Sequence, residues 1–199
     1  MKKFYFFLLM FIFFLFNSAL FSQEPEKNHG TDLLAFQDEE EVPENMRYFK
    51  EKYEEVYNEP FDAVWNAIKK SLGDCNCMIA HESYKQTDEG FYKGVLTSDM
   101  CVFASGSDSS YDKLKEYSVS MPVIHGAVWI NGRVTYKYIV QEHDDGTIHL
   151  TLKVEICGFE EKVTYSVHFW DASRNEKSNG ILEHRMLELI KKNIQAAKR

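Results

Sequence analysis

The sequence predicts an α+β fold in which a curved antiparallel β-sheet carries an N-terminal helix and a long C-terminal helix on one face. Two amphipathic stretches, at 60–73 and 178–199, have the apolar spacing of helices. Between them, apolar and polar residues alternate strictly on both sides of an Asp-Gly turn at 144–146. Both helices need an apolar surface to cover, and the apolar face of the sheet is the surface that this pattern offers.

Residues 1–22 have the layout of a secretory signal peptide. Lys2 and Lys3 are followed by an unbroken apolar run at 4–16 and then by several small residues. An uncleaved membrane anchor is the alternative, because Leu20 stands where a small residue is expected before the cut. The prediction is an exported protein, periplasmic or extracellular, whose membrane contact is limited to an uncleaved signal segment.

Residues 23–46 predict a flexible acidic leader, and residues 47–199 predict a single α+β domain. The leader carries eight acidic groups and two prolines but few large apolar residues. The whole chain has a formal net charge of −8 and no basic stripe, which argues against nucleic acid as a partner. The same acidity argues against binding to anionic membrane surfaces.

Residues 53–58 alternate weakly and predict an edge strand, with a helix that starts at Met46 as the alternative. The stretch that follows, "NEPFDAVWNAIKKSLGD", predicts a helix. Asn58 is a candidate cap, Pro60 suits the first turn, and Gly73 suits the end of the helix. The apolar residues that share one face of this helix are Phe61, Val64, Trp65, Ile68 and Leu72.

Residues 77–170 are expected to form strands. The segments 77–84 and 91–99 flank a plausible hairpin loop. Residues 116–130 hold one or two strands, with Pro122 at an edge or a break. The stretch "SGSDSSYD" at 105–112 has neither the lysine of a phosphate loop nor the spacing of a calcium loop, and it is expected to be a flexible loop.

The clearest strand signal is the pair of runs around the Asp-Gly turn. The residues expected on the apolar face are Val134, Tyr136, Tyr138, Val140, Ile148, Leu150, Leu152, Val154, Ile156, Val163, Tyr165, Val167 and Phe169. The opposite positions are mostly Thr, Lys, His and Glu, so the sheet is expected to have one dry face and one wet face.

The last helix is expected to begin after Ser178 or Asn179, either of which can cap it. Its apolar stripe comprises Leu182, Met186, Leu189, Ile190 and Ile194. This stripe is predicted to pack on the same face of the sheet as the first helix.

This order of elements resembles the helix-grip architecture over about residues 53–195. "VYNEPFDAVWNAIKKSL" and "VTYKYIVQEHDDGTIHLTLKVEI" resemble the opening strand and helix and the central hairpin of the START and pathogenesis-related-10 superfamily. That resemblance implies a lipid or other apolar ligand held between the sheet and the C-terminal helix. "PFDAVWNAI" is also similar to the first helix of envelope lipoprotein domains like the C subunit of the outer-membrane β-barrel assembly machine. The chain lacks the lipid-attachment cysteine of that second group.

Four cysteines in an exported chain favour disulfides, and Cys75, Cys77, Cys101 and Cys157 allow three pairings. A metal site at Cys75, Cys77 and His81 is the alternative, since thiolates and imidazole suit copper(I) or zinc. It would need a further ligand from Cys101 or Cys157. A redox role is the third alternative, although C-x-C is not the usual C-x-x-C motif.

No other pattern carries a catalytic motif, so the protein is expected to be non-enzymatic, with no cofactor. Ser105 has no G-x-S-x-G setting. His149 and His168 share the polar face of strands that are candidates for neighbours, and two such histidines can bind a metal. Exposed strand histidines are more often plain polar surface, and this is the expected role of both.

Three functions remain open. The first is an exported envelope protein that acts as a protein-interaction module, with Trp129 and Trp170 as candidate surface anchors. The second is a carrier of an apolar or amphipathic small molecule in a cavity lined by Trp65, Tyr136 and Tyr138. A filled core in which the same three rings pack is the alternative to that cavity. The third function is metal binding by the cysteine cluster.

Overall fold

A computed structural model of the chain describes residues 44–119, 123, 125–161, 167–171 and 178–199, which belong to one unit spanning Glu41–Arg199. The predicted signal peptide and nearly all of the predicted leader lie outside the described residues. The end of the leader, Glu44–Met46, forms a short 3-10 turn, η1. Among the described helices, none has the length and apolar character needed to cross a membrane.

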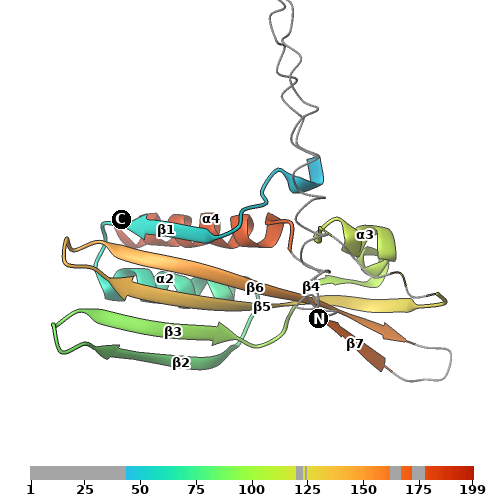
Figure 1. Ribbon diagram of the computed structural model, residues 1–199, viewed down its shortest axis with the longest axis horizontal. Coiled ribbons are helices and arrows are strands. Elements are labelled where there is room, and N and C mark those ends of the chain that lie inside the picture. Colours follow the sequence, from blue (N-terminus) through green and yellow to red (C-terminus); the bar gives the residue numbers. More distant parts are fainter. Residues whose placement is uncertain (1–43, 120–122, 124, 162–166, 172–177) are drawn as a thin grey trace, which may run out of the picture. The chain divides into compact units, whose positions relative to one another are not determined.

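The described residues contain seven strands that form one antiparallel sheet (Figure 1). The strands are β1 Tyr53–Tyr57, β2 Ile79–Gln86, β3 Tyr92–Ser98, β4 Cys101–Ser105, β5 Val128–Glu142, β6 Ile148–Glu161 and β7 Val167–Asp171. Their order is β1-β6-β5-β3-β2, while β4 pairs with the first part of β5 and β7 with the last part of β6. The α+β class with a curved antiparallel sheet is therefore confirmed, and the strand predicted at 53–58 is β1.

The β5–β6 hairpin is the longest pairing of the sheet, as the alternation predicts. Its turn places Gly146 at a φ of 79°, a conformation that favours glycine. The Asp145 carboxylate accepts hydrogen bonds from the backbone N–H (2.9 Å) and the hydroxyl (2.6 Å) of Thr147. Tyr138 then lies opposite Leu152, which puts both apolar series on the same face.

Two long helices, α2 (Phe61–Asp74) and α4 (Ile181–Ala197), cover that face together (Figure 1). They touch each other through Asn193, whose side-chain amide donates to the Ser71 hydroxyl at 2.9 Å and to the Asp74 carboxylate at 2.9 Å. The opposite face of the sheet carries neither helix and is called the open face below. The helix predicted at 60–73 and the long C-terminal helix are both confirmed.

The ends of the helices differ from the predicted ones. Pro60, not Asn58, is the N-cap of α2, and the helix continues past Gly73 to Asp74. Asn76 takes the left-handed conformation (φ 55°) that closes the helix, so that the N–H of Cys77 donates to the carbonyl of Leu72 at 2.9 Å. Asparagine tolerates this conformation better than most residues, which is why it replaces the expected glycine.

Helix α4 begins at Ile181 with Gly180 (φ 92°) as its N-cap, one or two residues later than a cap at Asn179 or Ser178 would give. The two predicted caps still act at this turn: the Ser178 hydroxyl accepts from Gly180 N at 3.2 Å, and the Asn179 side chain accepts from Ile181 N at 3.3 Å. In the apolar stripe Leu187 is buried, and Leu189 is only partly so. The stripe is therefore wider than the predicted one, since α4 contacts both the sheet and α2.

The segment 105–112 is not the flexible loop that its composition predicts. It forms a 3-10 turn, η2 (Gly106–Ser109), and the first turn of a short helix, α3 (Tyr111–Lys115). The Ser110 hydroxyl caps α3 by accepting from Lys113 N. Leu114 of α3 packs with Ala104 in a small second apolar cluster at this end of the sheet.

Three predicted features fall wholly or partly outside the described residues. These are Pro122, the first half of the strand predicted at 163–170, and the side chains of Val167–Asp171. The backbone of β7 is described and pairs with β6.

Candidate functional site

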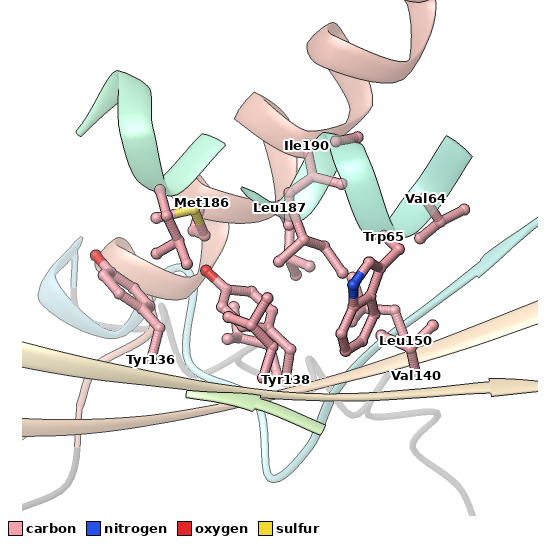
Figure 2. Close-up of a cluster of buried hydrophobic side chains, with 14 of the residues drawn as sticks. Val64, Trp65, Tyr136, Tyr138, Val140, Leu150, Met186, Leu187 and Ile190 are labelled. Atoms are coloured by element: carbon pink, nitrogen blue, oxygen red, sulfur yellow. The ribbon is translucent and has the colours of Figure 1, made fainter. Parts of the chain in front are cut away.

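The three residues predicted to line a cavity lie in the closed core between the sheet and the helices. The exposed fractions of Trp65, Tyr136 and Tyr138 are 3%, 6% and 0%. Figure 2 shows the rings of Tyr136 and Tyr138 standing on the sheet and pointing toward Met186 and Leu187 of α4. Burial raises the pKa of both phenols well above its usual range, so both hydroxyls stay protonated.

Trp65 joins α2 to the β2–β3 hairpin. Its indole N–H donates to the Glu82 carboxylate at 2.8 Å, and its ring lies with Phe61 and Tyr84 at centroid distances of 5.4 Å each. Gly94 of β3 makes room for the ring, because a Cβ there would lie 2.7 Å from a Trp65 ring carbon. The hairpin is thus held firmly against α2, which gives Trp65 a structural role.

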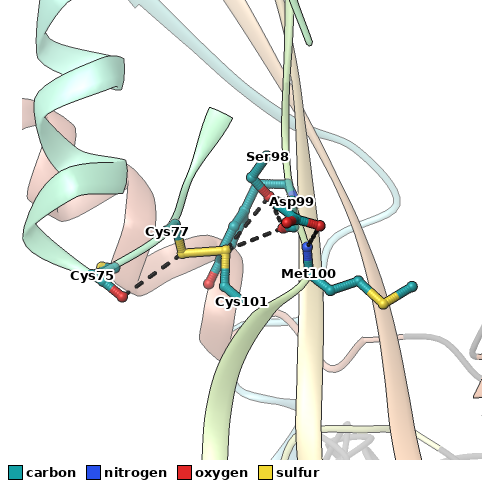
Figure 3. Close-up of a disulfide and its surroundings, with 7 residues drawn as sticks. Cys75, Cys77, Ser98, Asp99, Met100 and Cys101 are labelled. Atoms are coloured by element: carbon teal, nitrogen blue, oxygen red, sulfur yellow. Dashed lines mark hydrogen bonds between the residues drawn. A yellow bond between two sulfur atoms is a disulfide. The ribbon is translucent and has the colours of Figure 1, made fainter. Parts of the chain in front are cut away.

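The cysteines form one disulfide, Cys77–Cys101, with a Cα–Cα distance of 5.2 Å (Figure 3). It links the end of α2 to the start of β4 across 24 residues of sequence. Two of the four disulfide candidates are therefore confirmed as a pair. Cys75 is an exposed free thiol, and Cys157 is buried, with its Sγ donating to the carbonyl of Arg133 at 3.7 Å. The predicted pairings that join Cys77 to Cys75 or Cys157 are not the observed one.

The disulfide removes Cys77 from the metal alternative, because an oxidised sulfur offers no thiolate. His81 lies on the open face of β2, while Cys75 caps the end of α2. Within the described residues, no group of three His, Cys, Asp or Glu side chains is placed to hold a metal ion. The structure does not support metal binding at Cys75, Cys77 and His81.

The alternative of a metal site at His149 and His168 is also not supported by the strand register. His149 pairs with Gln141 near the start of β6, whereas His168 pairs with Glu160 near the end of β6. The two positions are eleven residues apart along one strand, too far for one metal ion. His149 instead stacks on His143, with a centroid distance of 3.9 Å.

Trp129, a predicted surface anchor, is partly buried against the second apolar cluster of Ala104 and Leu114. The side chain of Trp170, the other predicted anchor, lies outside the described residues. The structure therefore does not favour Trp129 as an exposed anchor.

A groove of about 460 Å³ lies on the open face, across β2, β3 and β5. The residues that line it are His81, Ser83, Tyr84, Lys85, Lys93, Gly94, Val95, Thr97 and Lys137. We call it the open-face groove. Its walls come from neighbouring strands of one antiparallel sheet, so its shape depends on the ladder rather than on a loop.

The open-face groove is basic in a protein that carries a net charge of −8. Lys85 lies directly opposite Lys93 across the β2–β3 ladder, and Lys137 lies directly opposite Lys153 across β5–β6. Like charges directly opposite one another in an antiparallel pair destabilise the sheet. Among the described residues none of these four lysines has an ion pair, although seven other ion pairs do form there.

Reasoning from the sequence missed this groove. The expected wet face included Lys137 and Lys153, but only as polar surface. The signal that could have identified the site is the set of lysines in the two predicted hairpins: Lys137 and Lys153 on both arms of one, and Lys93 on an arm and Lys85 at the start of the predicted loop of the other. The register then places them face to face. That register depends on loop length and bulges, which the hydrophobic pattern alone leaves open.

Comparison with models of known protein families and with curated proteins finds no match for this chain. The α+β fold with a long C-terminal helix is observed, whereas the resemblance to the START and pathogenesis-related-10 superfamily, or to envelope lipoprotein domains, stays a prediction. The function must therefore be argued from the site itself.

Proposed function

We propose that the chain is an exported, non-enzymatic protein of the cell envelope, periplasmic or extracellular, and that it acts as a protein-interaction module through the open-face groove. The observation that carries this proposal is two pairs of opposed lysines, Lys85–Lys93 within the groove and Lys137–Lys153 at its border with β6. An acidic partner would relieve a repulsion that the fold itself leaves in place.

Two further features support this role. The groove lies on a ladder that Trp65 and Glu82 fix to α2, so the site is preorganised for a partner. The Cys77–Cys101 disulfide is compatible with an oxidising location outside the cytoplasm.

The experiment compares two triple variants that change the net charge equally. The first reverses Lys85, Lys93 and Lys137 to Glu in the groove. The control reverses Lys50, Lys115 and Lys192, which are exposed elsewhere. Proteins cross-linked to the wild-type chain in its native envelope are identified by mass spectrometry, purified, and titrated against all three chains.

The proposal predicts a defined partner that binds the wild type and the control equally and the groove variant at least about tenfold more weakly. Equal affinity for both triple variants would show that binding depends on overall charge rather than on the groove. Failure to find any partner whose binding depends on the groove would remove the proposal.

A second candidate function, a carrier of a small amphipathic molecule, is favoured by two buried hydroxyls. The hydroxyls of Tyr138 and Tyr57 are buried, and within the part of the chain that the structure describes they have no hydrogen-bond partner. A bound polar group would satisfy such an orphan hydroxyl, and so would a buried water. Native mass spectrometry of the protein from its own envelope separates the two functions, because a carrier would show a discrete lipid-like adduct and an empty chain would contradict it.

A further inference from the structure

The strand β2 is the free edge of the sheet next to the open-face groove. It pairs with β3 on one side, and no described strand pairs with its other side. Every residue from Ala80 to Gln86 is exposed. An uncovered edge strand presents a row of unpaired N–H and C=O groups to which another extended chain can pair.

The direction of the backbone groups on β2 follows from the hairpin register. The N–H of Thr87 donates to the carbonyl of Phe91 at 2.7 Å, so the groups of Thr87 point toward the β3 side. Because this direction alternates along an antiparallel ladder, Lys85 and Ser83 also bond toward β3. The N–H and C=O groups of Glu82, Tyr84 and Gln86 then point outward.

The hairpin that carries this edge is firmly supported. The Tyr92 ring stacks on Phe61 of α2, while the Tyr84 ring lies tilted against Phe61 and edge-on to Trp65. The Glu82 carboxylate accepts from Lys69 at 2.9 Å as well as from Trp65, and these bonds lower its pKa, the Lys69 bond most. The edge is therefore ready to accept a strand without rearrangement.

We propose that the partner of the open-face groove supplies an extended acidic segment that adds to β2 as a new edge strand. This inference rests on the proposed function and gives the chemistry of the partner. On the open face, alternate side chains of the added strand would lie beside His81, Ser83 and Lys85, with Lys93 one strand further on. Acidic residues at these positions would contact the lysines.

The other face of the added strand has a different requirement. Its side chains would lie beside Glu82 and Tyr84, and the Tyr84 ring is 50% exposed. An apolar or aromatic side chain would cover that ring. The segment that fits is consequently one in which acidic residues alternate with apolar residues.

A polyanion such as a nucleic acid is a different partner class with the same charge. The net charge of −8 opposes it at long range, whereas a short peptide strand gains main-chain hydrogen bonds as well. Lysines on an edge can also serve only to block self-association of the sheet. The experiment below tests both possibilities.

The probe is a fluorescein-labelled peptide of about ten residues that alternates glutamate with valine, enough to span β2. Its binding to the purified protein is followed by anisotropy. A matched peptide replaces every glutamate with lysine. Two further peptides keep all charges but carry N-methyl groups, one on the glutamate amides and one on the valine amides. With the glutamates on the open face, the glutamate amides point toward β2 in one strand direction and the valine amides in the other. Each methylated peptide therefore blocks either parallel or antiparallel pairing with β2.

Strand addition predicts that the glutamate peptide binds and the lysine peptide does not. It also predicts that one N-methylated peptide binds at least about tenfold more weakly than the other, because main-chain bonds supply part of the affinity. Lys85→Glu combined with Lys93→Glu should weaken binding by a similar factor. Amide exchange measured by NMR should slow at Glu82, Tyr84 and Gln86 on binding, and not at the backbone of β1.

Other outcomes would overturn the inference in distinguishable ways. Equal binding of both N-methylated peptides, with no amide protected at β2, would indicate charge attraction alone, and the proposed interaction function would stand. Equal binding of a single-stranded oligonucleotide would indicate a general polyanion surface. No binding of the glutamate peptide would reject an acidic strand, and the titration of the native partner would then decide the proposed function separately.

Discussion

The two edge strands of the sheet, β1 and β2, differ in how far the fold buries their side chains and pairs their charges. At the β1 edge, Tyr53 and Tyr57 are buried, and the Glu55 carboxylate pairs with Lys191 of α4 at 3.0 Å. At the β2 edge, every residue after Ile79 is exposed, and Lys85 faces Lys93 without an ion pair among the described residues.

A helix supplies a counter-charge on the buried side of both edges, because Lys191 of α4 pairs with Glu55 of β1 and Lys69 of α2 pairs with Glu82 of β2. The edges differ on the open face, where Glu54 of β1 pairs with Lys52. On the open face next to β2, Lys85 and Lys93 have no ion pair among the described residues, and we propose that another molecule neutralises them. The proposed binding surface therefore rests on charges that the fold does not neutralise.

The largest effect on stability is expected in β5, where Tyr138 points into the core and the adjacent Lys137 lies on the open face. Tyr138→Ala should lower the free energy of unfolding by about 3–5 kcal/mol, because it empties the fully buried centre of the core. Lys137→Ala, the adjacent residue on the open face, should change it by less than about 0.5 kcal/mol. Urea denaturation of both variants measures this, and a Tyr138→Ala loss near that of Lys137→Ala would indicate a spacious cavity instead of a packed core.

Loss of the disulfide should have the next largest effect. Cys77→Ser should cost about 2–4 kcal/mol, since it releases the constraint between α2 and β4. Cys75→Ser, at the exposed free thiol two residues away, is the control and should leave the melting temperature unchanged. A reducing agent should destabilise the wild type and not Cys77→Ser, and destabilisation of both would contradict the assignment.

Two glycines test how tightly the β2–β3 hairpin is held. Gly94→Ala should cost about 1–3 kcal/mol, because the new Cβ overlaps the Trp65 ring. Gly73→Ala, in the last turn of α2 with open space around it, should stabilise by about 0.5–1 kcal/mol. The two melting temperatures should move in opposite directions, and equal shifts would show that the hairpin is not packed on α2.

Helix α4, whose Lys191 pairs with Glu55 of β1, also contains a buried carboxyl group, that of Glu183. Burial raises the pKa of Glu183 in α4, although the Ser178 hydroxyl donates to its carboxylate at 2.7 Å. A raised folded-state pKa favours the protonated form, so stability is highest below the unfolded pKa and falls as pH rises through the folded one. Glu183→Gln should therefore be more stable than the wild type near pH 7, with the difference vanishing near pH 4. Lower stability of Glu183→Gln near pH 7 would show that the carboxylate is stabilising.

The smallest effect is expected at the unpaired lysines. Lys85→Gln should raise stability by about 0.2–0.5 kcal/mol at low salt, because it removes the repulsion from Lys93 at an exposed site. Added sodium chloride should reduce the gain, since it screens the repulsion in the wild type. Denaturation at two salt concentrations measures this. Lys113→Gln, which breaks an ion pair with Glu116, is the control and should show no gain.

The fold was largely predictable because its signals are local. The alternation from Val134 to Ile156 and the Asp-Gly turn specify the central hairpin, and the apolar stripes specify both helices. The helix ends were predicted less well, since Pro60, Asn76 and Gly180 act through backbone geometry that several residue types can adopt. The order in segment 105–112 was missed because it depends on Leu114 packing beneath the sheet end.

The candidate site was not predictable in the same way. Lys85 and Lys93 are separated by seven residues that include the hairpin loop, and their spacing alone does not show that they lie opposite each other. The cysteine spacing, in contrast, offered a metal site at Cys75, Cys77 and His81 as an alternative, and the disulfide removes Cys77 from that set. Charge repulsion is a property of pairs, and the pairs appear only once the register is known.

The most direct test of the account places a photo-reactive amino acid at two exposed positions on the open face, one at each edge of the sheet. Ser83 lies in the groove on β2, and Val56, which is 54% exposed, lies on β1. After illumination in the native envelope, the account predicts a discrete adduct with one protein at Ser83, lost when Lys85 and Lys93 are reversed to Glu, and none at Val56. Equal adducts at both positions, or an adduct at Ser83 that survives the charge reversal, would contradict it.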